Sequence, residues 1–185
     1  MGGVDKGLTI FRGRPLAVYA IEALKQVTDR ILVNANRHHD IYAGFGYPVV
    51  ADADGDFNGP LAGLLSAMRV ADTPLLLIVP CDSPLVRGDL LERLHATLLT
   101  QNADICVAHD GERLHPVFLI VRRSLVTSLA DYLAGGERKV EGWLRRHRLA
   151  LADFSDHPEM FANVNTEEEL ARLGLESRFS GQTGS

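Results

Sequence analysis

Four polar groups in the first half of the sequence have the types and spacing expected of a phosphate-binding site. A glycine-rich opening surrounds Lys6, and Asn34, Asp52 and Asp82 each follow an apolar, β-branched or aliphatic run. In open parallel sheets, ligands bind beyond the carboxyl ends of the strands. We therefore expect these four groups to line one pocket.

The opening segment could bind phosphate through Gly2, Gly3 and Gly7, which flank Lys6. Glycines let backbone N–H groups approach a phosphate closely, and an ammonium group neutralises its charge. The spacing is not that of a Walker A loop. Taken alone, the same residues also describe a flexible chain end with one lysine.

Asp82 follows the aliphatic run 75–79, in the segment Pro80-Cys81-Asp82-Ser83-Pro84. A carboxylate at a strand end suits Mg²⁺, which proteins hold with one or two carboxylates together with substrate phosphates. The alternative is an Asp-Ser-Pro turn that only ends the strand. We expect Asp82 to be a Mg²⁺ ligand.

Asp52 is the better nucleotide contact among three alternating carboxylates, because it alone stands directly at a predicted strand end. Asp54 and Asp56 are expected on a solvated loop. The loop lacks the glycine and the glutamate that a calcium-binding loop requires at fixed positions. Asn34 and Asn36 could bind a base or ribose edge, although asparagines at strand ends are also common turn formers.

Other classes of site find little support in the sequence. The seven histidines have no metal-ligand spacing, and no G-x-S-x-G elbow is present for serine catalysis. One basic cluster is expected to be a solvated helix face, with an anionic small-molecule site as the alternative; it comprises Arg138, Lys139, Arg145, Arg146 and Arg148.

Short apolar runs alternate with longer segments of helical period, which indicates an α/β fold with a doubly wound, mostly parallel sheet. Helices are expected from Pro15, at 39–43, from Pro60, at 89–100, at 124–134, around Trp143 and from Thr166. Strands are expected at 30–34, 48–51, 75–79, 104–108, 117–121 and 149–154, with 104–108 and 117–121 forming a hairpin. The run 75–79 predicts a central strand buried on both faces.

The chain has 185 residues, of which 46% are hydrophobic and 23% charged, enough for the core of a single domain. The net charge of −5 disfavours nucleic-acid binding, and no apolar run approaches the roughly 20 residues of a membrane span. The two cysteines, Cys81 and Cys106, form no CxxC pair, so a reducing cytoplasmic location is expected. Residues 1–176 are assigned to the domain and 177–185 to a disordered tail.

With these residues assembled, the chain resembles the molybdenum cofactor guanylyltransferase family over residues 1 to about 173. The resemblance is carried by Met1-Gly2-Gly3-Val4-Asp5-Lys6-Gly7, Asn34-Ala35-Asn36-Arg37, Asp52, Gly59-Pro60-Leu61-Ala62-Gly63, Pro80-Cys81-Asp82, His115-Pro116 and Asn163-Val164-Asn165-Thr166. It implies a Rossmann-like nucleotidyltransferase domain of GT-A-like architecture. It also implies that the enzyme transfers GMP from GTP to the terminal phosphate of molybdopterin-bound molybdenum and releases pyrophosphate.

The resemblance further implies GTP and Mg²⁺ as ligands, with Lys6 and Asp82 catalytic and Asp82 the metal ligand. The implied nucleotide contacts are Gly2, Gly3, Lys6, Asn34, Asp52 and Asp82, and the region 115–165 is implied to face the pterin. Molybdoenzyme delivery proteins are the expected protein partners.

Three alternatives remain open at the level of the sequence: a related cytidylyltransferase, a sugar-phosphate nucleotidyltransferase and a non-catalytic nucleotide-binding adaptor. The family begins with a buried strand and an L-A-G-G loop that precede the motif found here at Met1. We therefore expect the sequence as written to lack the first strand of its sheet.

Overall fold

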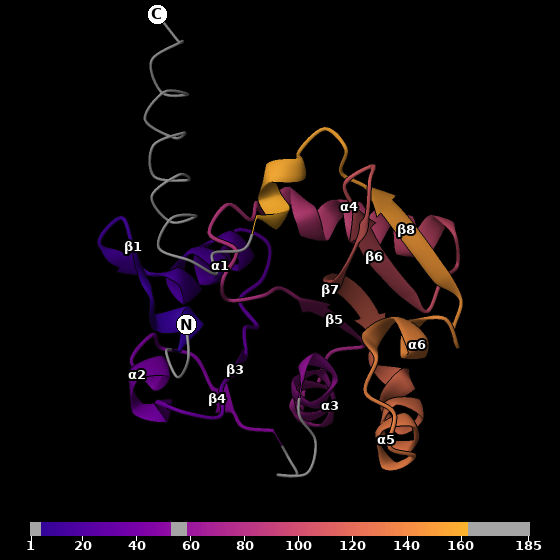
Figure 1. Ribbon diagram of the computed structural model, residues 1–185, viewed down its shortest axis with the longest axis horizontal. Helices are drawn as coiled ribbons and strands as arrows, with labels where there is room; N and C mark the ends of the chain where they lie inside the picture. Colours follow the sequence, from indigo (N-terminus) through magenta and orange to yellow (C-terminus); the bar gives the residue numbers. More distant parts are fainter. Residues whose placement is uncertain (1–4, 53–58, 163–185) are drawn as a thin grey trace, which may run out of the picture.

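A computed structural model of the chain describes residues 5–52 and 59–162. Its main sheet has the order β5-β7-β6-β8, with β5 at Leu75–Ile78, β6 at Ile105–His109, β7 at Leu114–Arg122 and β8 at Leu149–Asp153. β7 runs antiparallel to β5 and to β6, whereas β8 runs parallel to β6. β5, β6 and β8 therefore point the same way, which confirms the mostly parallel sheet (Figure 1).

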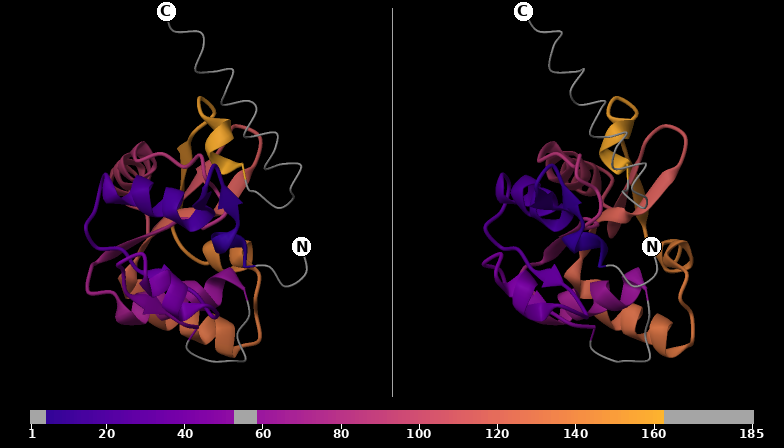
Figure 2. Two further views of the ribbon diagram at one scale, coloured as in Figure 1. Left: turned by 90° about the vertical axis from the view of Figure 1, so that its left-hand side faces the viewer. Right: turned by 60° about the vertical axis from the view of Figure 1, so that its left-hand side comes forward.

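Helices cover both faces of this sheet, so the doubly wound α/β prediction is confirmed (Figure 2). One face is covered by α1 (Leu16–Lys25) and α4 (Asp89–Thr100), and the other by α3 (Pro60–Val70), α5 (Val126–Ala134) and α6 (Val140–Leu144). Successive strand residues point to opposite faces. In β6, Cys106 therefore packs in the first layer and Val107 in the second.

The N-terminal part contributes two smaller strand pairs. β1 (Ile10–Phe11) and β2 (Arg14–Pro15) form a hairpin, and β3 (Val33–Asn34) pairs in parallel with β4 (Val49–Val50), with α2 (His39–Ala43) between them in the chain. Short 3-10 helices are η1 (Lys6–Leu8), η2 (Arg123–Leu125) and η3 (Pro158–Phe161). Within the described ranges, neither small pair is hydrogen-bonded to the main sheet.

The expected hairpin of the main sheet is confirmed, since β6 and β7 pair in antiparallel register with a bulge between Val107 and Ala108. Proline also marks helix starts as predicted. Pro60 opens α3, where its fixed φ suits the first turn, and Pro15 directly precedes α1.

The prediction of a central, doubly buried strand at 75–79 is wrong for the described sheet. β5 is the last strand in the order, and among its four residues only Leu76 is buried. Its side chains still pack in both helix layers, Leu77 in one and Leu76 in the other. The aliphatic run 75–79 thus indicates that helices cover both faces of the strand, but it does not indicate where the strand lies within the sheet.

Several sequence predictions lie outside the described residues. They are the contacts assigned to Gly2 and Gly3, the loop carboxylates Asp54 and Asp56, the helix from Thr166 and the tail 177–185. In the part of the chain that is described, no helix combines the length and the apolar character needed to cross a membrane.

Candidate active site

Lys6 and Asp82 lie next to each other at the edge of the sheet where β5 ends. The Lys6 Nζ atom is 3.5 Å from Asp82 Oδ2, and the two side chains are 47% and 13% exposed, respectively. Asp82 reaches this place because Pro80 and Cys81 lead the chain out of β5. The structure thus brings together two of the residues that the sequence assigned to one pocket.

Lys6 is presented by η1, a single 3-10 turn. Asp5 caps this turn, with its carboxylate accepting a hydrogen bond from the Gly7 backbone N–H at 3.2 Å. A side-chain acceptor at this position satisfies a backbone donor that the short helix leaves unpaired. The cap therefore fixes the backbone from which the lysine extends.

Asn34 and Asp52 form a second polar group at the ends of β3 and β4. The Asn34 side-chain amide donates to Asp52 Oδ1 and to the Val50 carbonyl, both at 3.0 Å, and Asn36 also binds Asp52. Parallel pairing of Val33 with Val49 sets the two strand ends side by side. The Asp52 carboxylate is thus oriented by two amide donors.

One pocket of about 350 Å³ lies between the two groups. Its lining residues come from both sides: Asp5, Asn34, Ala35, Asn36, Arg37, Tyr42 and Cys81. Of the four residues expected to line one pocket, Asn34 does so, whereas Lys6 and Asp82 are represented by their neighbours Asp5 and Cys81, and Asp52 is not a lining residue. The volume is within the range of small-molecule sites, which begins at about 300 Å³. A ligand in this pocket would lie between the asparagine pair and the segment that carries Lys6 and Asp82.

Two glycines of this region are needed because other side chains occupy the space of a Cβ. A Cβ on Gly63 in α3 would collide with Asn34 Oδ1, and one on Gly7 would collide with the Tyr42 hydroxyl oxygen. In the segment Gly59-Pro60-Leu61-Ala62-Gly63, the last residue, Gly63, allows α3 to lie close to Asn34 because it has no Cβ.

The pocket contains a cysteine that is unsuited to act as a nucleophile. Residue Cys81 is exposed as a whole, but its Sγ faces Gly7, 3.2 Å from the place of a Cβ there. Desolvation, together with the charges of Asp82 and Asp5, raises the pKa of the Cys81 thiol to about 11. The thiol therefore stays protonated near neutral pH, whereas thiol catalysis needs the thiolate.

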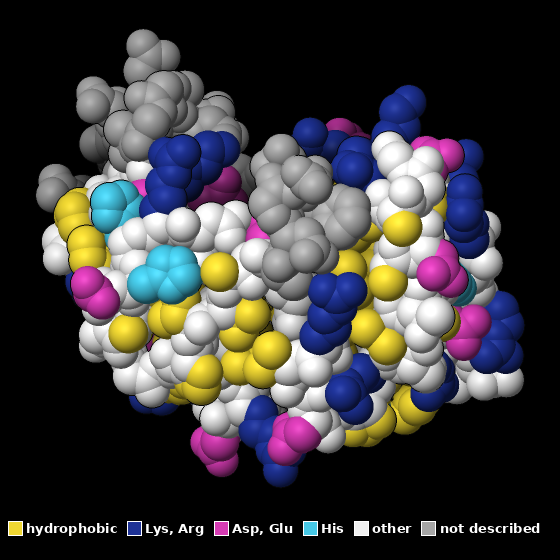
Figure 3. Space-filling view, turned by 90° about the horizontal axis from the view of Figure 1, so that it is seen from below, with side chains coloured by type: hydrophobic (Ala, Val, Ile, Leu, Met, Phe, Trp, Pro, Cys, Tyr) yellow, Lys and Arg dark blue, Asp and Glu magenta, His cyan; other side chains and the backbone are white. Residues whose placement is uncertain are grey.

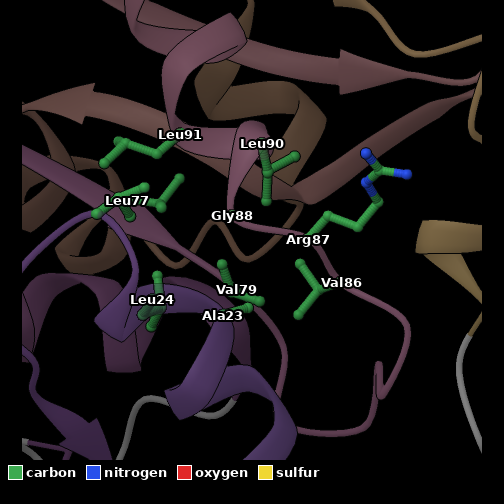
Figure 4. A pocket seen from close by; sticks show the side chains of 10 residues that line it. Ala23, Leu24, Leu77, Val79, Val86, Arg87, Gly88, Leu90 and Leu91 are labelled. Carbon is green, nitrogen blue, oxygen red and sulfur yellow. The ribbon is translucent and has the colours of Figure 1, made fainter.

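A second pocket is apolar and too small for a substrate. It lies among α1, β5 and the start of α4, where Leu24, Val79 and Leu90 line it (Figure 4). Its volume of about 10 Å³ is the room of roughly one water molecule. Of these two pockets, the polar one beside Asp5 has the room for a small-molecule ligand.

The carboxylates of this site pair with nitrogen-bearing side chains, Asp82 with Lys6 and Asp52 with Asn34 and Asn36. Among the described residues, no group of three His, Cys, Asp or Glu side chains is arranged to hold a metal ion. A metal ion on Asp82 would need further ligands from a bound substrate or from water.

Three arginines of the basic cluster near α6 pair with acidic side chains. Arg148 binds Asp104 at 2.7 Å, and Arg145 and Arg146 lie 3.8 and 4.0 Å from Glu141 and Glu137. On the face shown in Figure 3, Lys and Arg side chains are spread out, with Asp and Glu among them. This arrangement agrees with a solvated face and gives no support to an anion site.

A hydrogen bond between His115 and Asp110, near η3, was missed by the sequence reasoning, although His115 belongs to a quoted motif. His115 Nε2 lies 2.7 Å from Asp110 Oδ2, and the imidazole ring stacks on Phe161 at a centroid distance of 4.0 Å. Hydrogen bonds from the Arg113 backbone, and then from His115 and the Glu112 backbone, hold the pKa of Asp110 well below its ordinary value. The turn signal Asp110-Gly111 predicted this loop, but it did not predict the side-chain contact between Asp110 and His115.

The family model for the MobA-like NTP transferase domain matches residues 1–151. The chain belongs to the MobA-like NTP transferase family. A molybdenum cofactor guanylyltransferase of Shewanella sediminis is 46% identical over 173 residues, which cover 94% of this chain and 88% of that protein.

Solved structures share the fold of this MobA-like chain at low sequence identity. The molybdopterin-guanine dinucleotide biosynthesis protein A of Archaeoglobus fulgidus superposes with a TM-score of 0.80 at 18% identity, covering 96% of this chain and 92% of that one. The 2-C-methyl-D-erythritol 4-phosphate cytidylyltransferase of Thermus thermophilus gives a TM-score of 0.69 at 16% identity and 94% coverage of both chains. The nucleotidyltransferase architecture expected from the sequence is therefore confirmed.

Proposed function

We propose that this MobA-like chain transfers GMP from GTP to the terminal phosphate of molybdopterin-bound molybdenum cofactor and releases pyrophosphate. The observation that carries the proposal is the approach of Lys6 to Asp82 beside a pocket lined by Asn34 and Asn36. A relative 46% identical that is named molybdenum cofactor guanylyltransferase supports the choice of nucleotide and acceptor.

In the proposed reaction, an oxygen of the acceptor phosphate bonds to the α-phosphorus of GTP. The bond from that phosphorus to the oxygen bridging to the β-phosphate breaks, and pyrophosphate leaves with the electron pair. Little covalent chemistry is asked of the protein, because positioning and charge neutralisation dominate phosphoryl transfer. Lys6, half exposed at the pocket edge, supplies a positive charge for the phosphates.

Asp82 fits the part of a single-carboxylate Mg²⁺ ligand. Its Oδ2 lies 3.5 Å from the Lys6 ammonium, and a carboxylate carries lone pairs on both oxygens, so Asp82 can bind a cation in addition to this ion pair. Mg²⁺ bound there would neutralise the triphosphate and the pyrophosphate leaving group. Substrate phosphates and water would complete its coordination.

The asparagine and Asp52 group is assigned to the guanosine moiety. Asp52 is held by Asn34 and Asn36, so its carboxylate has a set orientation for accepting hydrogen bonds from a ribose or a base.

Molybdoenzyme delivery proteins as protein partners and a cytoplasmic location also remain predictions of the sequence.

The test combines the purified chain, Mg²⁺ and molybdopterin cofactor with equal amounts of GTP and CTP. Pyrophosphate release and the mass of the product are measured together. The proposal expects the guanine dinucleotide product. A cytosine dinucleotide product would show that the chain is a cytidylyltransferase. GTP binding without pyrophosphate release would support the non-catalytic nucleotide-binding adaptor instead.

A further inference from the structure

Tyr42 belongs to none of the motifs, yet its hydroxyl group reaches the segment that presents Lys6. The residue lies in α2, is 3% exposed and lines the polar pocket. Its hydroxyl donates a hydrogen bond of 2.6 Å to Asp5 Oδ1. This bond joins α2 to a part of the chain that lies 37 positions earlier in the sequence.

The acceptor of this bond also caps η1. Asp5 Oδ1 receives the Gly7 backbone N–H at 3.2 Å as well as the Tyr42 hydroxyl. The carboxylate is therefore held from two directions, by the turn that it caps and by a buried side chain. A carboxylate that accepts two hydrogen bonds has little freedom to rotate, so the turn that it caps is fixed too.

The packing around this bond is tight. Gly7 is buried, and a Cβ on it would collide with the Tyr42 hydroxyl oxygen and lie 3.2 Å from Cys81 Sγ. Tyr42 and Cys81 thus fill the space beneath the turn from which Lys6 extends. Burial, and then the hydrogen bond to Asp5, raise the pKa of the Tyr42 hydroxyl, so it remains a proton donor throughout the neutral range.

We propose that Tyr42 is a positioning residue that holds Lys6 at the phosphate site through Asp5. The inference rests on the proposed nucleotidyl transfer. Lys6 has a long flexible side chain that is 47% exposed, so the position of the η1 backbone sets the range that its ammonium group can reach, the place beside Asp82 included. Loss of the Tyr42 hydroxyl group frees Asp5, widens that range and weakens the contact of Lys6 with the triphosphate.

The test compares Tyr42→Phe with Tyr132→Phe as a matched control. Tyr132 is also 3% exposed and also donates one hydroxyl hydrogen bond, to the Lys139 carbonyl at 2.9 Å, but it lies in α5 and lines no part of the polar pocket. Both substitutions keep the ring and remove one hydrogen bond. We expect Tyr42→Phe to lower kcat/KM for GTP about tenfold, the size of one hydrogen bond to a charged group. Tyr132→Phe should stay within about twofold of the parent, with a similar change in unfolding midpoint.

A double-mutant cycle with Lys6→Ala separates positioning from general stability. If Tyr42 acts through Lys6, Tyr42→Phe changes the Kd for GTP, measured by calorimetry with Mg²⁺, in the parent and changes it by less than about twofold in the Lys6→Ala background. Equal losses in both backgrounds, or no loss in either, would overturn the inference. Because this readout is binding, it stays valid even if the parent shows no GMP transfer, which would refute the proposed function instead.

Asp5 provides a second route should Tyr42→Phe fold poorly. Asp5→Asn keeps an acceptor oxygen for the Tyr42 hydroxyl and for the Gly7 N–H, whereas Asp5→Ala removes both contacts. We expect Asp5→Asn to retain most of the GTP affinity that Asp5→Ala loses. Equal affinities in these two variants would contradict the positioning role.

Discussion

Asn36 and Asp52 bind each other through two reciprocal hydrogen bonds. The Asn36 amide nitrogen donates to Asp52 Oδ2 at 2.8 Å, and the Asp52 backbone N–H donates to Asn36 Oδ1 at 2.9 Å. One side chain thus fixes both the backbone and the carboxylate at the end of β4. The orientation of Asp52 depends on Asn36 as much as on Asn34.

Replacing Asn36 tests this dependence. Asn36→Ala removes both bonds, so KM for GTP should rise about fivefold with little change in kcat, because the loss concerns ground-state binding. Steady-state kinetics measure the split. Gln101→Ala, at the exposed end of α4, is the control and should match the parent. A fall in kcat at unchanged KM would show that Asn36 and Asp52 act in the chemical step rather than in GTP binding.

Replacing Asp82 tests the metal assignment. A charge contact at about 4 Å and an effective dielectric near 20 is worth about 4 kcal/mol, roughly a thousandfold in rate if it is made only in the transition state. Asp82→Ala should therefore lower kcat by about that factor while its circular dichroism stays that of the parent. The control Asp72→Ala removes a carboxylate that is 79% exposed and pairs with Arg30 in a surface contact. Normal Mg²⁺-dependent turnover in Asp82→Ala would exclude the assignment.

Gly63→Ala separates helix stability from site geometry. Alanine favours the interior of α3 by up to about 1 kcal/mol, but its Cβ would displace the Asn34 side chain from Asp52. We expect an unfolding free energy within about 1 kcal/mol of the parent and a KM for GTP raised about tenfold. At Gly135 the same change meets only ordinary contacts of 3.4 and 3.5 Å, so Gly135→Ala should leave KM unchanged. Unaltered GTP binding in Gly63→Ala would show that Asn34 can relax without loss.

The Asp110 carboxylate should make stability sensitive to acid. Its pKa is lower in the folded chain than the roughly 3.9 of an unfolded chain, so it stabilises the fold above that value. The contribution is lost as the pH falls below about 4 toward the folded pKa. Asp110→Asn keeps an acceptor for the Arg113 and Glu112 N–H groups but cannot ionise. Thermal unfolding from pH 7 down to 2 should therefore show a shallower decline for Asp110→Asn, and parallel curves would contradict the prediction.

The strand ends could be located from the sequence because each is a local pattern. An apolar run followed directly by Asn34 or Asp52, or after Pro80 and Cys81 by Asp82, needs no knowledge of distant residues. Lys6 was assigned to the same pocket through the rule that ligands bind beyond the carboxyl ends of parallel strands, and it lies 3.5 Å from Asp82. The proposed roles of these residues stay predictions.

Other features could not be read from local patterns. β1 and β2 have two residues each, too few to show alternation, and only the positive φ angles of Arg12 and Gly13 define their turn. The hydrogen bond of Tyr42 to Asp5 joins distant segments, and a tyrosine in a five-residue helix gives no indication of it. The place of β5 at the end of the sheet depends on which strands pair, which an aliphatic run does not specify.

The reversed direction of β7 has a consequence for how the rim of the sheet can vary. Because β7 begins where β6 ends, the connecting turn 110–113 projects from the same rim on which Asp82 stands. The register pairs of β6 with β7, from Ile105–Val121 to His109–Leu114, include no residue of that turn. Under the proposed function, a change in this turn would therefore alter one part of the rim while the segment that carries Asp82, after β5, stays as it is.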